Sequence, residues 1–449
     1  MEFGQTKTAI RNFNSSKMRE KLIAITIGGG DKTLDPAYKA AVFKEYIEMA
    51  FPNLAIRNVE PITTAASLNS VSAYAEIAVQ GSGYKPTFVK IHIESDTHSE
   101  SSLGAENEYS QANLLARHGW PVLVPLISSN SREYPLLIYP RVEAPTLFDL
   151  LKESYEKREN LITSRELAVL SRLNRQVGRT MVDSSTVADS REAVDSPVQT
   201  LFLERFKEGG RIDMWYKPDT RFTLPERGGD ITWRELLEAK WVINGDSYDI
   251  TLSEVIKNAR KYLSFAGESR ALVCVSHGDD HAGNIFMDKK EGRATIFDPA
   301  FAGWNPASLS NIKALAHSCV VPMGGMYYDP KIGDVFYDWD RDKHVMHVDV
   351  PFESSALYGA HEAIAKQITD LRILPLIQRS KQAGIDINSE YERIKYALAG
   401  CALLTINISR LLEQNDGRGQ GLLPLTIMLA ELKGLPMLSY LREEITQKL

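Results

Sequence analysis

The sequence predicts an α+β protein whose first part is rich in strands and whose second part is mostly helical. Three runs show the alternation of apolar and polar side chains that is typical of half-buried strands: residues 53–62, 73–80 and 86–94. From residue 146 onward the apolar spacing becomes that of amphipathic helices, most clearly over 164–182. One short β element, at residues 271–298, interrupts the helical part.

These patterns divide the chain into a helical extension at 1–52, a strand-rich part with one main helix at 53–141, and a mostly helical part at 142–449. Asp35 followed by Pro36 predicts the start of the helix in the extension. Residues 184–198 are polar and are predicted to form a loop. The third part holds an insertion near 200–245, which we interpret either as a substrate lid or as a packed helical addition.

Composition and charge argue against several classes of protein. At 43% hydrophobic and 24% charged residues, the 449-residue chain is typical of a globular protein, and its net charge of −6 argues against a nucleic-acid partner. No apolar run approaches the roughly 20 residues that span a bilayer, and the N-terminus lacks the apolar core of a signal peptide, so we expect no membrane partner. Three widely spaced cysteines in apolar contexts predict reduced core thiols in a cytoplasmic protein: Cys274, Cys319 and Cys401.

The stretch 271–303 carries the strongest functional pattern in the chain. A short apolar run ends in a polar loop that contains Asp279 and Asn284, and a second short run leads to Asp298. Two buried strands joined by a tight turn would place these side chains on one small patch. Carboxylate and amide oxygens are ligands that a hard divalent cation prefers, so we expect a metal site here.

Two histidines in the same loop admit two interpretations. His277 and His281, together with Asp279 and Asp280, resemble the ligand set of a metal-dependent phosphohydrolase. Alternatively, both histidines form hydrogen bonds that hold the shape of the loop, which is the interpretation we prefer. Asp280 is expected to face solvent or substrate.

One lysine and one glutamate in the first part are also candidates. In the strand at 86–94, Lys90 shares a face with Phe88 and His92. That face is either the solvated side of an antiparallel sheet or a functional surface. Glu108 lies in the first turns of a predicted helix at 105–118, where an acid is favoured by the helix dipole even on an exposed surface.

The order of these motifs resembles a known family. The motif His277-Gly278-Asp279-x-His281-x-Gly283-Asn284, followed by Ile296-Phe297-Asp298 and Gly303, resembles the aminoglycoside phosphotransferase and choline kinase-like superfamily, which is related to the protein kinases. Val89-Lys90-Ile91 looks like the family's lysine strand, Glu108 its helix glutamate and residues 137–142 its hinge. The resemblance covers roughly residues 55–320. It implies a bilobal protein kinase-like fold, with an N-lobe antiparallel sheet and one key helix at 53–141 and a larger, mostly helical C-lobe at 142–449.

The resemblance also implies ATP and Mg²⁺ as cofactors and a role for each matching residue. Asp279 would orient the substrate hydroxyl and accept its proton, Asn284 and Asp298 would bind Mg²⁺, and Lys90, fixed by Glu108, would bind the α and β phosphates. Further nucleotide contacts would come from Ser67, in the loop at 63–72, and from Tyr139, Arg141 and Val142 at the adenine edge. Two features depart from the family: the loop at 63–72 has no glycine, and Asn305 lies where relatives often place an acid.

The sequence leaves the acceptor's charge open. A loop at 325–349 interleaves acids with aromatic residues, which favours an amine-bearing acceptor. An anionic acceptor is favoured instead by four arginines: Arg205, Arg211, Arg221 and Arg227.

We therefore expect a kinase that phosphorylates a hydroxyl of a small polar molecule such as an aminoglycoside, an amino sugar or a choline-like alcohol. The alternatives are an inactive nucleotide-binding regulator, an enzyme that transfers AMP, and a metal-dependent phosphohydrolase.

Overall fold

The computed structural model describes residues 20–22, 35–62, 70–79, 83–92, 105–129, 134–157, 159–224, 229–320, 336–350, 358–405, 407–413, 418–433, 440–441 and 443–444. The chain divides into two compact units. Unit 1 consists of Met1–Ala116 and Val122–Glu143, and unit 2 consists of Arg117–Pro121 and Ala144–Leu449.

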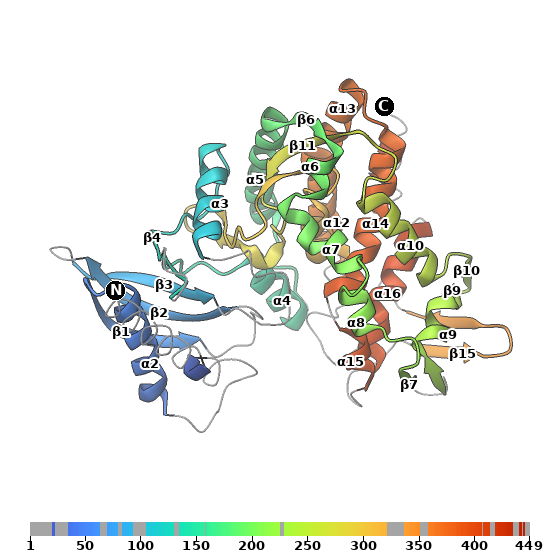
Figure 1. Ribbon diagram of the computed structural model, residues 1–449, viewed down its shortest axis with the longest axis horizontal. Helices are drawn as coiled ribbons and strands as arrows, with labels where there is room; N and C mark the ends of the chain where they lie inside the picture. The colour runs from blue at the N-terminus through green and yellow to red at the C-terminus, as the bar shows by residue number, and fades with distance from the viewer. Residues whose placement is uncertain are drawn as a thin grey trace, which may run out of the picture. The chain divides into compact units, whose positions relative to one another are not determined.

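Unit 1 is built on a five-stranded antiparallel sheet with the order β1-β2-β3-β5-β4 (Figure 1). Its strands are β1 (Leu54–Ile62), β2 (Ser70–Val79), β3 (Lys85–His92), β4 (Ile127–Ser128) and β5 (Leu136–Pro140). The three predicted strands are confirmed, although β2 begins three residues earlier than the alternation indicated. The loop at 63–69, with Ser67, lies outside the described residues.

Helices α2 (Pro36–Ala50) and α3 (Ala105–Arg117) lie on opposite faces of this sheet (Figure 1). The predicted start of α2 is confirmed, since the Asp35 side chain accepts a hydrogen bond from the Ala37 amide. Phe43 and Ile47 of α2 are fully buried in one core with Val89 and Ile91 of β3. The other face of the sheet packs Tyr139 of β5 against apolar side chains that include those of α3.

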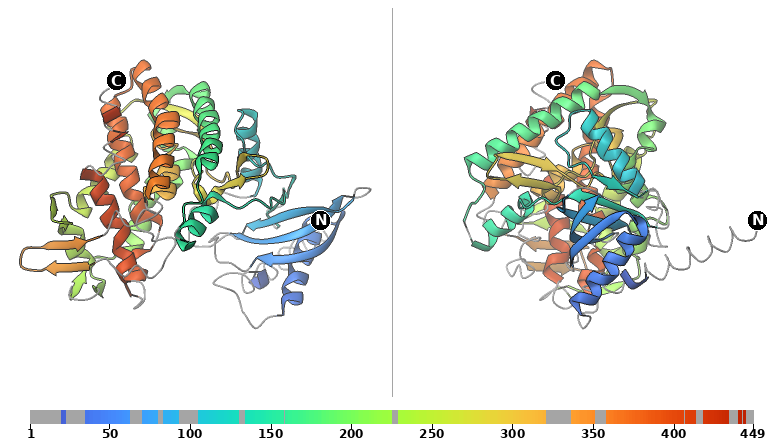
Figure 2. Two further views of the ribbon diagram at one scale, coloured as in Figure 1. Left: turned by 180° about the vertical axis from the view of Figure 1, so that it is seen from behind. Right: turned by 90° about the vertical axis from the view of Figure 1, so that its left-hand side faces the viewer.

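Unit 2 is mostly helical, as the apolar spacing predicts. Its helices include α4 (Leu147–Lys157), α5 (Ser164–Ser184), α7 (Leu203–Phe206), α8 (Arg211–Trp215), α9 (Trp233–Glu238), α10 (Leu252–Leu263), α11 (Ile312–Leu315), α12 (Tyr358–Ile368), α13 (Leu374–Gln382), α14 (Ile387–Thr405), α15 (Ile408–Glu413) and α16 (Arg418–Lys433). Two π-helical turns extend these helices, η5 (Ala316–Val320) after α11 and η7 (Thr369–Ile373) between α12 and α13. Figure 2 shows α5, α12 and α13 side by side, as their contacts require.

Short strands interrupt the helices of unit 2. In one three-stranded sheet, β11 (Arg270–Ser276) lies between β14 (Gly303–Pro306) and β6 (Thr186–Asp189). β12 (Ile285–Asp288) and β13 (Arg293–Ile296) form a hairpin. A four-stranded sheet has the order β10-β9-β16-β15, from β9 (Lys240–Ile243), β10 (Asp246–Tyr248), β15 (Phe336–Asp340) and β16 (Val345–Asp349), and β7 (Arg221–Thr223) pairs with β8 (Asp230–Thr232).

Two predicted loops are wrong. The polar segment 184–198 contains β6, α6 (Ser190–Val194) and the start of η3 (Pro197–Leu201), because β11 offers an edge with which β6 pairs. Residues 336–349 form the β15–β16 hairpin, where alternate side chains such as Tyr337 and Met346 are buried. The remaining part of the predicted loop, 325–335, lies outside the described residues.

The insertion at 200–245 is packed, not lid-like, in the residues the structure describes. Trp233 and Trp241 are both fully buried. The Tyr216 hydroxyl donates to the Leu403 carbonyl at 2.7 Å, and Trp233 Nε1 donates to Ser409 Oγ at 2.9 Å. These bonds attach the insertion to the end of α14 and to α15.

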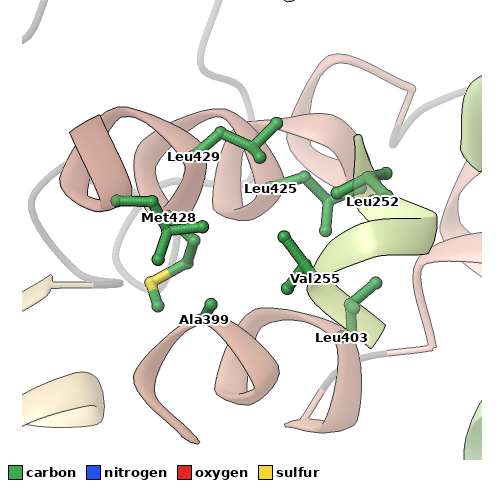
Figure 3. A pocket seen from close by; sticks show the side chains of 8 residues that line it. Leu252, Val255, Ala399, Leu403, Leu425, Met428 and Leu429 are labelled. Carbon is green, nitrogen blue, oxygen red and sulfur yellow. The ribbon is translucent and has the colours of Figure 1, made fainter. Parts of the chain in front are cut away.

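Side chains of α10, α14 and α16 pack together around a small apolar cavity of about 10 Å³ (Figure 3). Val255, Leu403 and Leu425 line it with other aliphatic side chains. A cavity of that size has room for about one water molecule, so it is a packing defect and not a ligand site. None of the helices in the described part of the chain has the length and apolar character that crossing a membrane requires.

Candidate active site

Lys90 and Glu108 form a buried ion pair in unit 1. Lys90 Nζ lies 2.9 Å from Glu108 Oε2, and the two side chains are 12% and 1% exposed. The Tyr139 hydroxyl donates to the other carboxylate oxygen at 2.5 Å, and His92 Nε2 lies 3.0 Å from Oε2. The interpretations of Lys90 as part of a solvated face and of Glu108 as a surface acid are therefore wrong, because α3 places the glutamate over the lysine side of the sheet.

The surroundings of Glu108 keep its carboxylate ionised. Burial raises the pKa of Glu108, but the charge of Lys90 and the contacts with His92 and Tyr139 outweigh it and hold the pKa well below its usual range. A buried carboxylate that stays charged is a fixed anchor for an ammonium group. Lys90 is thereby held in one position without being fully covered.

The other residues expected to bind nucleotide are described apart from Ser67. Tyr139 lies within β5, and its buried side chain supports Glu108. The Arg141 guanidinium lies 4.2 Å from the centre of the Tyr74 ring, and the Arg141 amide donates to the Pro86 carbonyl at 3.2 Å. Val142 follows in the connection between β5 and α4 and is half-buried. Their contacts with adenine remain predictions.

In unit 2, the loop after β11 is held by its own side chains. Asn284 Nδ2 donates to the Asp279 carbonyl at 2.8 Å. His277 Nδ1 accepts from the Asp279 amide at 3.3 Å, while its Nε2 lies 3.0 Å from the Phe297 carbonyl. His281 Nδ1 accepts from the Gly283 amide at 3.0 Å. The prediction that both histidines hold the shape of the loop is confirmed.

Asn284 and Asp298 lie at neighbouring ends of the β12–β13 hairpin. Ile285 pairs with Ile296, and the Phe297 amide donates to the Asn284 carbonyl at 3.0 Å. Because the Asn284 amide nitrogen bonds Asp279, its side-chain oxygen is left for another partner. Asp298 has a φ of +60°, which costs a non-glycine residue on the order of 1–3 kcal/mol and is typical of functional sites.

These two residues fit a magnesium ion, since an amide oxygen and a carboxylate are hard donors and Mg²⁺ usually keeps several waters and substrate oxygens as its remaining ligands. A hydrolytic zinc centre would need about three protein ligands. No group of three His, Cys, Asp or Glu side chains suited to a metal occurs among the described residues. The donor set thus fits the magnesium interpretation better than the phosphohydrolase one.

The prediction that Asp280 faces solvent or substrate is wrong. Asp280 is 1% exposed and forms an ion pair with Arg372 of η7, which is also 1% exposed. Two residues earlier, Gly278 has a φ of +80° and packs so closely against Phe301 that a Cβ would lie 2.9 Å from the Phe301 carbonyl oxygen. The ion pair of Asp280 with Arg372 therefore anchors the loop to η7.

Asn305, at the position where relatives often place an acid, forms supporting hydrogen bonds of its own. It is fully buried, its Oδ1 accepts from the Val198 amide at 3.0 Å, and its Nδ2 donates to Ser276 Oγ at 3.0 Å and to the Phe301 carbonyl at 3.1 Å. An asparagine can serve two acceptors and one donor at once, which a carboxylate cannot.

Sequence reasoning missed three buried polar residues around the loop: Lys313, His317 and Arg372. The only signal was their position inside apolar helical runs, where long charged side chains are rarely buried without a partner. Ser318, next to His317, supports the loop by accepting from the Ala282 amide at 2.8 Å.

Comparison with known proteins gives structural neighbours only. No family model and no curated protein matches the sequence. A Plasmodium vivax ethanolamine kinase structure matches at 9% identity and a TM-score of 0.41, over 95% of this chain and 96% of that one. A macrolide 2'-phosphotransferase type I matches at 12% identity and a TM-score of 0.32, over 82% of this chain and 98% of that one. An aminoglycoside-3'-phosphotransferase of type VIII matches at 12% identity and a TM-score of 0.36, over 80% of this chain and 97% of that one. The motifs of the sequence resemble those of small-molecule phosphotransferases. Structural matches with identities and TM-scores this low, however, carry no argument about the function of this chain.

Proposed function

We propose that this chain is an ATP- and Mg²⁺-dependent phosphotransferase that phosphorylates a hydroxyl of a small molecule in the cytoplasm. The observation that carries the proposal is the buried Lys90–Glu108 pair, with Lys90 held by an ionised carboxylate. A lysine fixed in this way binds the phosphates of a nucleotide as a positioned point charge. Burying the pair has no evident benefit for stability alone, because desolvation offsets much of its attraction.

The residues of unit 2 supply the other functions that phosphoryl transfer needs. Asn284 and Asp298 would hold Mg²⁺, which neutralises charge on the phosphates when bound. Asp279 has its amide held by His277 and its carbonyl by Asn284, while its side chain is only half-buried. A carboxylate positioned in this way orients the acceptor hydroxyl and accepts its proton as the phosphoryl group is transferred.

The chain retains all four residues that the reaction would use: Lys90, Asp279, Asn284 and Asp298. This favours a catalytically active enzyme over an inactive nucleotide-binding regulator, which would not need all four. Transfer of AMP would use the same cofactor with a different product. The candidate acceptors are small polar alcohols, including aminoglycosides, amino sugars and choline-like alcohols.

The test is an ATP-consumption screen of the full chain, with and without Mg²⁺, against amino sugars, aminoglycosides, choline-like alcohols, sugar acids, neutral sugars and nucleosides. We expect Mg²⁺-dependent turnover of at least one acceptor, with a product heavier by one phosphoryl group in mass spectrometry. A product heavier by AMP would overturn the reaction type. ATP-independent release of phosphate from a phosphoester would support the phosphohydrolase instead.

A further inference from the structure

A cavity of about 330 Å³ lies in unit 2 where β6, β11 and α13 meet (Figure 1). The residues that line it include Thr186, Val187, Leu272, Arg379, Gln382 and Ala383. Its volume falls within the roughly 300–1,000 Å³ that is typical of sites for small molecules. None of its lining residues belongs to the proposed active site.

One side of the cavity is apolar. Val187 of β6 pairs with Leu272 of β11, so the two side chains lie on the same face of the sheet. Leu272 is 1% exposed, whereas Val187 is 39% exposed. Ala383, at the C-terminal end of α13, adds a methyl group. Covering an exposed valine with an apolar group is favourable, so this side suits the apolar part of a ligand.

The other side of the cavity carries hydrogen-bond donors. Within the described part of the chain, no partner engages the guanidinium of Arg379, the hydroxyl of Thr186 or the amide of Gln382. Arg379 is also the only charged residue among the described residues that line the cavity. Because a guanidinium presents a planar fork of N–H donors, the group that fits it best is a carboxylate bound through both oxygens.

A second arginine lies next to the cavity. Arg270 of β11 lies two residues before Leu272 and therefore on the same face of the sheet, and its Nη2 is 3.8 Å from where a Cβ of Gly384 would lie. Two acids are close in the chain, Asp189 at the start of α6 and Asp386 before α14, and their carboxylates accept from backbone amides. In the residues that the structure describes, neither acid forms an ion pair with Arg270 or Arg379.

The cavity shares two elements with the proposed active site. Leu272 lies near the start of β11, whose other end leads into the loop with Asp279. Arg379 lies about two helical turns after Arg372, the anchor of that loop, because α13 directly continues η7. A ligand in the cavity would therefore contact two elements that position the loop, and it would leave the catalytic residues uncovered.

We propose that this cavity binds a small carboxylate that carries an apolar body. Arg379 binds the carboxylate, Thr186 and Gln382 donate further hydrogen bonds to it, and Val187 and Leu272 cover the apolar body. This inference goes beyond the proposed phosphotransferase function and is independent of it, since it uses none of the residues of that reaction.

The direct test uses benzoate, benzyl alcohol and benzylammonium, which share one ring and differ in the charge of the head group. Each is titrated into the full chain, and its Kd is measured by ligand-observed saturation-transfer NMR. We expect benzoate to bind most tightly and benzylammonium most weakly. Mg²⁺ and a non-hydrolysable ATP analogue should leave the benzoate affinity within about twofold of its value without them.

Arg379→Met should weaken benzoate binding about fivefold or more and leave benzyl alcohol binding within about twofold, because only the charged contact is lost at a partly exposed site. Thr186→Val, which keeps the side-chain shape, should weaken benzoate binding by about two- to threefold. Arg179→Met is the matched control, because it removes an exposed arginine of α5 that does not line the cavity, and it should bind benzoate like wild type.

A variant that fills the cavity gives a second measurement. Ala383→Leu should weaken the binding of benzoate and benzyl alcohol alike by about fivefold or more, because the larger side chain occupies the space of the ring. Far-UV circular dichroism of each variant checks that it is folded. If Ala383→Leu does not fold, the exposed Arg379→Met and Thr186→Val substitutions decide the question.

Four results would overturn the inference. They are the absence of benzoate binding to wild type, equal benzoate affinity in wild type and Arg379→Met, unchanged binding in a folded Ala383→Leu variant, and displacement of benzoate by the ATP analogue. The last result would assign benzoate to the nucleotide site and would leave the phosphotransferase proposal standing. Failure of the analogue itself to bind would contradict that proposal and leave the cavity's assignment to the other measurements.

Discussion

Asp280, next to the proposed catalytic Asp279, is held by Arg372, which lies 92 residues later in the chain. Both side chains are at most 1% exposed. Removing one partner of a buried pair leaves the other charge buried and uncompensated, which costs about 3–5 kcal/mol. The pair thus fixes the catalytic loop to η7.

Replacement of Arg372 by methionine should therefore lower the free energy of unfolding by about 3–5 kcal/mol, measured by urea denaturation of the full chain. The double variant Asp280→Leu/Arg372→Met should recover part of the loss, because no charge is then left unpaired. Arg234→Met, which breaks an exposed pair with Asp219, should change stability by less than about 1 kcal/mol. A loss in Arg372→Met no larger than in Arg234→Met would contradict the anchoring role.

Gly178 allows η7 to reach the loop. A Cβ at this position of α5 would lie 1.8 Å from the Leu371 carbonyl oxygen, next to Arg372. Gly178→Ala should therefore force the two helices apart and cost about 1–3 kcal/mol or more, together with a drop in turnover. Gly359→Ala in α12 is the matched control, since its Cβ would meet nothing within 4 Å, and it should stabilise by up to about 1 kcal/mol. Equal stability of the two variants would show that α5 and η7 are less tightly packed than described.

Loss of the ammonium group at position 90 should weaken nucleotide binding. Lys90→Met should bind a non-hydrolysable ATP analogue at least tenfold more weakly in the presence of Mg²⁺, because a charge-assisted contact contributes about 1.5–3 kcal/mol. Lys85→Met, which removes an exposed lysine at the start of the same strand, should leave the affinity within about twofold of wild type. Unchanged affinity in Lys90→Met would remove the lysine from the nucleotide site.

A pH dependence follows from His361, whose buried ring lies 2.7 Å from the Ser318 carbonyl. Burial lowers the pKa of His361 to about 4, whereas the unfolded value is about 6.5. Below pH 6.5 the unfolded chain takes up a proton that the native chain does not, so stability falls as pH falls, until about pH 4. At pH 5 this amounts to about 2 kcal/mol relative to pH 7.

His361→Gln should remove that part of the dependence. The decline in the free energy of unfolding between pH 7 and pH 5 should be about 2 kcal/mol smaller in the variant than in wild type. His344→Gln, at an exposed turn, is the control and should keep the wild-type slope. Parallel curves for wild type and His361→Gln would mean that the histidine is protonated in the native state.

The sequence predicts the candidate site residues themselves better than it predicts the buried residues that hold them in place. Alternation in β3 places Lys90 on the face opposite Val89, and the spacing of Asp279, Asn284 and Asp298 follows from two short strands and a turn. These features depend on neighbours in the chain, which a pattern can register.

The buried residues that hold the site in place depend on contacts between segments that are distant in the sequence. Lys313 and Arg372 lie within helices whose apolar spacing is that of ordinary core helices, and their partners come from elsewhere in the chain. Asp280 was misjudged for the same reason, since a lone aspartate in a polar loop gives no sign of an arginine 92 residues away. Tertiary packing decides the burial of such side chains, and local pattern does not determine it.

Turnover of the Asp279→Asn variant tests the central claim most directly. With the best acceptor from the screen and saturating Mg²⁺ and ATP, we predict that kcat falls by about 100-fold or more, because the side chain no longer accepts the proton, while affinity for the ATP analogue stays within about twofold. Asp288→Asn, at the end of β12, where the carboxylate accepts from the Lys290 amide of the following turn, should keep wild-type turnover. Turnover in Asp279→Asn equal to that of Asp288→Asn would contradict the proposed phosphotransfer site.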